Sequence, residues 1–114
     1  MRADVAGTPV LGVEVDDETR CAHYATDRDV VAIAFACCET FYPCHRCHDA
    51  LADHPAEVWP RSARGERAVL CGSCGTRLQI RDYLDALEAD AACPACSVDL
   101  NPGCLDHVER YFEP

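Results

Sequence analysis

Residues 37–54 read CCETFYPCHRCHDALADH, a stretch that gathers four cysteines and three histidines. Cys44 and Cys47 form a C-x-x-C pair, whose two intervening residues let a tight turn direct both sulfur atoms at one tetrahedral ion. Two further pairs of the same spacing follow at Cys71/Cys74 and Cys93/Cys96. Gly72 and Gly75 strengthen the case for the second pair, because a turn that folds over a sulfur favours residues without a Cβ atom. Three such pairs predict zinc knuckles, and buried or redox-active thiols are the alternative.

The composition gives a reason for metal binding in a chain of this size. Ten of the 114 residues are cysteine, and the hydrophobic fraction of 49% includes them, so the supply of aliphatic and aromatic residues is modest. A chain this rich in thiols is either cross-linked by disulfides or folded around metal. We therefore expect metal ions to replace part of the hydrophobic core.

The sequence shows no signal for export or membrane insertion. Its N-terminal stretch, MRADVAGTPVLGVEVDDE, has no apolar core behind its single Arg, unlike a secretory signal peptide. The longest apolar run, Val30–Cys38, is much shorter than the roughly 20 residues that a membrane-spanning helix needs. We expect a cytoplasmic protein without a membrane partner, and the reducing cytoplasm favours metal over disulfides.

The charge argues against nucleic acid as a partner. Twenty acidic residues against ten Arg and no Lys give a net charge of −10. A phosphate backbone would be repelled over most of such a surface. The acidic, Lys-free composition fits adaptation to high salt and a GC-rich coding sequence equally well.

The pattern along the chain predicts one small α+β domain. Residues 1–8 are expected to form a disordered tail, and residues 9–114 the domain. The expected strands are an edge strand, a continuous apolar strand, and a hairpin around C-G-S-C-G; they cover residues 9–15, 30–36, 68–71 and 76–80. Helical spacing of apolar residues predicts one or two short helices, at 81–91 and 105–112, and the Pro- and charge-rich residues 55–67 an exposed loop. Tyr83, Leu87, Tyr111 and Phe112 are expected in the core.

The order of the remaining cysteines and histidines resembles that of the CHY-type zinc finger family, named for its Cys-x-His-Tyr opening. Here this opening is Cys21-Ala22-His23-Tyr24. It is followed in order by C-C, C-x-x-C-H, a lone His, C-G-x-C-G and C-x-x-C, and the resemblance spans nearly the whole chain, from Gly12 to Phe112. It implies a small, irregular, metal-dominated fold with three zinc ions. A related domain sits beside a RING finger in ubiquitin ligases, and another stands alone in a mitochondrial helper of small Tim assembly.

The resemblance implies twelve zinc ligands: Cys21, His23, Cys37, Cys38, Cys44, Cys47, His48, His54, Cys71, Cys74, Cys93 and Cys96. We expect three sets of four. The first is all-cysteine, with Cys44, Cys47, Cys71 and Cys74. The second holds Cys37, Cys38, His48 and His54. The third holds Cys21, His23, Cys93 and Cys96, and would join the start of the chain to its end.

Several of these residues have an alternative interpretation. Cys37 and Cys38 end an apolar run, where buried free cysteines are common, and the case for His48 and His54 depends mostly on the resemblance. His45 matches no motif position and is expected to face solvent. Cys104 and His107 are divided evenly between accessory ligands and structural residues.

The sequence favours a binding protein over an enzyme. P-C-H-R-C at residues 43–47 matches half of the zinc-deaminase signature, but no His-x-Glu precedes it. Sites with four protein ligands are closed and structural, whereas catalytic zinc keeps an open position. We expect a monomeric structural zinc domain that acts as an interaction or adaptor module for a protein client, with the loop around Trp59 free for that partner. The alternative is a factor that handles thiols and zinc, either transferring zinc or keeping the cysteines of a client reduced and metal-free.

Overall fold

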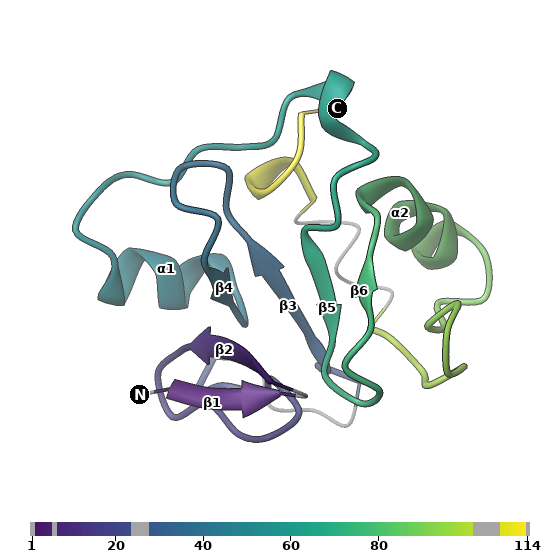
Figure 1. Cartoon of the computed structure of the whole chain (residues 1–114), viewed down its shortest axis with the longest axis horizontal. Helices are drawn as coiled ribbons and strands as arrows, with labels where there is room; N and C mark the ends of the chain where they lie inside the picture. The colour runs from purple at the N-terminus through teal and green to yellow at the C-terminus, as the bar shows by residue number, and fades with distance from the viewer. Residues whose placement is uncertain (1, 6, 24–27, 102–107, 114) are drawn as a thin grey trace.

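The structure is a computed structural model that describes residues 2–5, 7–23, 28–101 and 108–113. Six short strands form one sheet in the order β1-β2-β4-β3-β5-β6, with α1 near β4 and α2 near β6 (Figure 1). The elements are β1 (Arg2–Val5), β2 (Thr8–Leu11), β3 (Val31–Ala34), β4 (Phe41–Tyr42), α1 (His45–Leu51), the 3-10 helix η1 (Arg61–Ala63), β5 (Val69–Cys71), β6 (Arg77–Leu78) and α2 (Ile80–Glu88). The predicted small α+β fold is confirmed. None of the helices in these ranges is long and apolar enough to cross a bilayer.

Strand β3 is the centre of the sheet, as the apolar run at 30–36 predicts. It pairs antiparallel with β4 on one side and with β5 on the other. Ala32, Ile33 and Ala34 are all buried, because a strand with a neighbour on each side and elements packed over it leaves little surface to water. The predicted hairpin around C-G-S-C-G is also present, with β5 and β6 paired antiparallel.

The first residues of the chain differ from the predicted tail. Residues 2–5 form β1, which pairs antiparallel with β2, and Gly7 in the connecting turn has a φ of +86° that favours glycine. The missed signal is the alternation of polar Arg2 and Asp4 with apolar neighbours, which suits an edge strand. Val5 is buried, so this hairpin contributes to the core.

Helix α2 begins and ends before its predicted bounds of 81–91. Its buried residues are Ile80, Tyr83 and Leu87, and Tyr83 meets Phe112 edge to face with 6.5 Å between ring centroids. Tyr111 and Phe112 are buried as predicted. Of the predicted helix at 105–112, residues 105–107 lie outside the described residues, and residues 108–110 form a single 3-10 turn in place of an α-helix.

The loop at 55–67 is mostly exposed, as expected, but the side chain of Trp59 within it is half-buried. The indole Nε1 donates a hydrogen bond of 2.6 Å to the carbonyl of Ala34, and Trp59 forms a bridge with Phe112 in the C-terminal segment. A half-buried indole with its N–H already satisfied serves to join the loop to β3.

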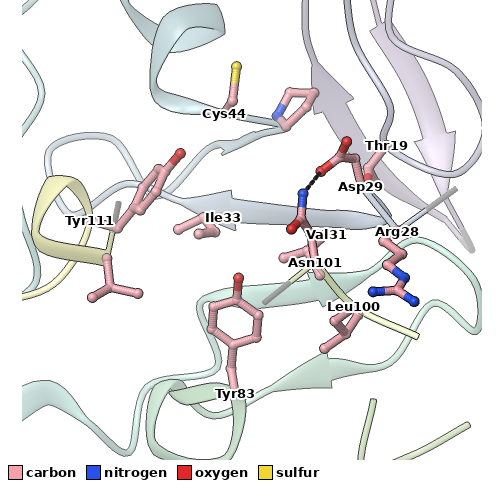
Figure 2. Close-up of a pocket in the computed structure, with 12 residues that line it drawn as sticks. Thr19, Arg28, Asp29, Val31, Ile33, Cys44, Tyr83, Leu100, Asn101 and Tyr111 are labelled. Carbon is pink, nitrogen blue, oxygen red and sulfur yellow. Dashed lines mark hydrogen bonds between the residues drawn. The ribbon is translucent and has the colours of Figure 1, made fainter. Parts of the chain in front are cut away.

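A small cavity lies between β3 and the C-terminal part of the chain (Figure 2). Its volume of about 50 Å³ is far below the several hundred Å³ of a typical small-molecule site. Beside it the side-chain amide of Asn101 donates a hydrogen bond of 3.0 Å to Asp29. We assign this region a role in packing.

Candidate metal centres

The structure brings the twelve predicted ligands together in three groups of four. In each group the ligand atoms all lie within 4.8 Å of one another. Site 1 consists of Cys21, His23, Cys44 and Cys47; site 2 of Cys37, Cys38, His48 and His54; and site 3 of Cys71, Cys74, Cys93 and Cys96.

Site 1 joins the segment after β2 to the beginning of α1. Cys44 Sγ lies 3.6 Å from Cys21 Sγ and 3.6 Å from Cys47 Sγ. His23 Nδ1 lies 3.5 Å from the sulfurs of Cys44 and Cys47 and 3.8 Å from that of Cys21. The backbone of Val13 connects the two segments: its N–H donates to Cys47 Sγ at 3.4 Å, and its carbonyl accepts from the residue between Cys21 and His23. All three cysteines are buried.

Site 2 joins the turn after β3 to α1 and the residues that follow it. The two sulfurs of Cys37 and Cys38 are 3.8 Å apart. His48 Nε2 lies 3.3 Å from Cys37 Sγ, 3.9 Å from Cys38 Sγ and 3.3 Å from His54 Nε2. Two imidazole nitrogens that face each other and two sulfurs form a mixed donor set of the kind that zinc prefers.

The surroundings of the two histidines act on them differently, because hydrogen bonding with Asp53 raises the pKa of His54, whereas the pKa of His48 is lowered. His48 stacks on Phe35 with 4.3 Å between ring centroids. Its burial, together with the nearby His54, lowers the pKa of His48, so the neutral imidazole that a metal requires is favoured. Asp53 lies 3.0 Å from His54 Nδ1, on the opposite side of the ring from the Nε2 that faces the site. Such a carboxylate fixes the tautomer and orientation of a histidine ligand.

Site 3 is made of two knuckles with the same backbone hydrogen bonds. In the first, Cys71 N–H donates to the carbonyl of Thr76, and Gly75 N–H donates to the carbonyl of Cys71. In the second, Cys93 and Ser97 make the corresponding bonds. Gly75 has a φ of +76° and Ser97 a φ of +66°, so both turns need the left-handed conformation at the same place.

The other predicted glycine of the first knuckle, Gly72, has a different role. A Cβ atom at this position would overlap the carbonyl oxygen of Glu18, because the knuckle packs against the loop before site 1. In site 3 the sulfurs of Cys71 and Cys96 are 3.8 Å apart. Cys71 and Cys93 are buried, whereas Cys74 and Cys96 are exposed.

The distances fit tetrahedral zinc. Zinc–sulfur bonds of about 2.3 Å place two sulfurs about 3.8 Å apart, and zinc–nitrogen bonds of about 2.0–2.1 Å place two nitrogens about 3.3–3.4 Å apart. The sulfur–sulfur distances of 3.6–3.8 Å and the nitrogen–nitrogen distance of 3.3 Å in the three sites agree with these values. The side chains therefore already have the separations that three zinc ions require.

The pKa values of the thiols indicate how difficult it is to form several thiolates close together without a cation. Hydrogen bonding with Cys21 and Cys47 and then burial raise the pKa of Cys44, and burial raises the pKa of Cys71. At Cys74 burial also raises the pKa, but hydrogen bonds with Thr76, Cys71 and Cys96 together outweigh it and lower the pKa to about 7. Crowded thiols resist losing several protons together, so an entering Zn²⁺ displaces those protons and cancels the repulsion that follows.

The expected grouping is right for site 2 and wrong for the other two sites. The all-cysteine site of Cys44, Cys47, Cys71 and Cys74 does not form, nor does the site that joins Cys21 and His23 to Cys93 and Cys96. The sheet gives the reason. Strand β3 lies between β4, which leads to Cys44, and β5, which ends at Cys71. Two strand spacings amount to about 10 Å, too far for the two knuckles to share an ion.

The remaining candidates are placed only in part. Cys104 and His107 lie outside the described residues, as does Tyr24. His45 is not in any of the three groups, but it is half-buried and does not simply face solvent. Its ring packs edge to face with Tyr111, and its backbone N–H donates a hydrogen bond of 2.9 Å to the Tyr111 hydroxyl. Sequence reasoning missed Asp53 and the backbone of Val13. Asp53 could have been found from the sequence, because it is an acidic residue next to a histidine ligand. The contact of the Val13 backbone leaves no signal in the sequence.

Comparison with known protein families matches residues 21–83, more than half of the chain, to CHY zinc fingers. The chain belongs to the CHY zinc finger family. It is 36% identical over 107 residues to Helper of Tim protein 13 of Saccharomyces cerevisiae, covering 93% of this chain and 91% of that protein. It is 39% identical over 108 residues to an uncharacterized protein of Schizosaccharomyces pombe, with 95% and 92% covered.

A second protein named Helper of Tim protein 13, from Kluyveromyces lactis, is 36% identical over 103 residues and matches over 90% of this chain and 87% of its own length. No solved structure matches this CHY domain. Family membership and three tetrahedral Cys/His groups together identify a zinc-binding CHY domain with places for three zinc ions.

Proposed function

We propose that this CHY domain is a zinc-stabilised interaction module that helps a client protein to fold or assemble, without catalysing a reaction. The observation that supports it is the closed form of the sites. Each of the three groups supplies four protein ligands, which complete the coordination sphere of a tetrahedral ion. Catalytic zinc, in contrast, needs an open position for water or substrate. The zinc ions then serve to hold the surface that a client recognises.

The relatives support a helper role. Two of the yeast proteins that match nearly this whole chain carry the name Helper of Tim protein 13. We propose the same class of role here, with a protein as the client and neither nucleic acid nor membrane as a partner. The net charge of −10 favours a client with a basic surface.

Chemical crosslinking of the tagged, zinc-loaded chain in its own cells, followed by mass spectrometry of the attached proteins, tests this proposal. Among the described residues, Leu51 and Val58 are the exposed large hydrophobic side chains, at 43% and 40%. We expect a defined client, and a weaker crosslink for Leu51→Gln combined with Val58→Thr. The control combines Ala50→Gln with Ala56→Thr, which changes exposed neighbours without removing a large apolar group. If the chain attaches no protein above the level of an unrelated acidic domain, the proposal is wrong.

Metal handling is a second candidate function, and one observation favours it. Two of the four ligand residues of site 3, Cys74 and Cys96, are exposed. A zinc ion held at an exposed thiolate edge is accessible to the ligands of another molecule, which a purely structural ion does not need to be. Measuring whether zinc passes from the intact domain to an added thiol ligand without unfolding separates this function from the first.

A further inference from the structure

The chain order of the ligands divides the three sites into a coupled pair and a separate site. Sites 1 and 2 alternate along the sequence, and both use α1. Cys44 is the N-cap residue of this helix, Cys47 in the helix belongs to site 1, and His48, the next residue, belongs to site 2. All four ligands of site 3 come from two knuckles, of which the first begins at the last residue of β5 and the second follows α2.

Helix α1 couples site 1 to site 2 because so short a helix is not stable without the contacts that it makes at both sites. It has seven residues and no side-chain capping hydrogen bond at its N-terminus. Helices this short are unstable without tertiary contacts. Removing the ion of site 1 releases Cys44 and Cys47, and the loss of the helix then displaces His48 from site 2. The two ions therefore depend on each other.

Site 3 differs from the pair in exposure as well. Site 1 has three buried sulfurs and a half-buried histidine, and site 2 has no exposed ligand. In site 3 the second cysteine of each knuckle, Cys74 or Cys96, is exposed, and the sulfurs of these two residues lie within 4.8 Å of each other. An incoming ligand can reach the zinc of site 3 from this edge while Cys71 and Cys93 still hold it.

We propose that the zinc of site 3 exchanges with a dithiol at the Cys74–Cys96 edge, while sites 1 and 2 retain their ions as one unit. This inference deepens the metal-handling function and rests on it. The first dithiol replaces Cys74 and Cys96 on the zinc, and a second dithiol then replaces Cys71 and Cys93, so that the ion leaves bound to four dithiol sulfurs. The four thiol protons of the two dithiols pass to the four cysteines of site 3, and no electrons are transferred.

The experiment exposes the three-zinc protein to 2,3-dimercaptopropanol and follows the zinc count by native mass spectrometry. Free cysteines are alkylated with N-ethylmaleimide at each time point and located by peptide mapping. We expect the two-zinc protein to form at least about tenfold faster than later species, because the exposed edge needs no unfolding of the core. In this two-zinc protein the alkylated residues should be those of site 3, and the protein should then lose its two remaining ions together.

Two results would overturn the inference: alkylation of site 1 or site 2 cysteines in the two-zinc protein, or a one-zinc protein that accumulates. In either case zinc still leaves the folded domain, and metal handling survives. If no ion leaves faster than the domain unfolds, both the inference and the metal-handling function are wrong. The matched variant Cys96→Ser should keep two zinc ions and its near-UV circular dichroism, whereas Cys47→Ser should lose two ions; a Cys96→Ser protein with fewer than two ions contradicts the separation.

Discussion

Replacing Gly72 by alanine should destabilise the domain through one steric contact. The added Cβ atom would overlap the carbonyl oxygen of Glu18 and lie 2.6 Å from its carbonyl carbon and 2.9 Å from the Thr19 hydroxyl. The atoms that it meets first belong to the backbone, so no rotamer change relieves the contact. The knuckle cannot retreat freely either, because Gly72 N–H donates a hydrogen bond of 2.6 Å to the carbonyl of Val30.

The expected loss is about 1–3 kcal/mol in the free energy of unfolding, the usual cost of adding a methyl group where the packing is already closed. Gly65→Ala is the matched control. Its Cβ atom would meet only the end of the flexible Arg81 side chain, at 2.9 Å. We expect this control to stay within about 0.5 kcal/mol of the original protein.

Guanidinium unfolding at a buffered free zinc concentration, followed by Trp59 fluorescence, measures both variants. Native mass spectrometry should still count three zinc ions in Gly72→Ala, because no ligand is removed. The reasoning is refuted if Gly72→Ala unfolds at the same denaturant concentration as Gly65→Ala.

Four further predictions follow from the sites and the packing. The purified protein should carry three zinc ions by native mass spectrometry, and a count of one or none after gentle purification would contradict the three tetrahedral groups. Complete chelation should abolish the near-UV circular dichroism signal, since zinc binding supplies much of the folding free energy; a signal that persists would show a self-sufficient core. Ser97→Gly should stabilise the domain by up to about 1 kcal/mol by relieving a φ of +66°, and an unchanged denaturation midpoint would argue against strain there. Trp59→Phe should cost about 1 kcal/mol or more by removing the hydrogen bond to Ala34; because this variant has no tryptophan, both proteins are unfolded with far-UV circular dichroism as the signal, and equal stability would mean that this bond contributes nothing.

The sequence predicts the local parts of the sites better than their combination. The C-x-x-C spacing predicts each knuckle because two residues suffice to bring its sulfurs together. Which knuckle partners which other segment depends on the order of the strands. Val31 of β3 pairs with Cys71, and Phe41 of β4 pairs with Ala34 on the other side of β3, so the central strand separates two knuckles that the spacing alone would combine.

Helix α1 and strand β1 show why short elements escape prediction. In residues 45–51 two of the seven positions are metal ligands, and their buried side chains face two different sites. The helix therefore lacks the single apolar stripe from which a helix is predicted. In β1 the apolar members of the alternation are small or few, and only pairing with β2 gives the segment a fixed place.

The sequential order of the sites has a consequence for synthesis on the ribosome. All eight ligands of sites 1 and 2 lie between Cys21 and His54, so an emerging chain can bind two zinc ions before β5 has been made. A site that joined Cys21 to Cys96 would have left the thiol of Cys21 without metal until Cys96 had been synthesised. Site 3 needs only a further loop in which Cys71 and Cys96 are 25 positions apart, and closing so short a loop is cheap in chain entropy. The chain can thus bind its metal ions in the order in which the ligands are synthesised, and few reactive thiols are without metal at any stage.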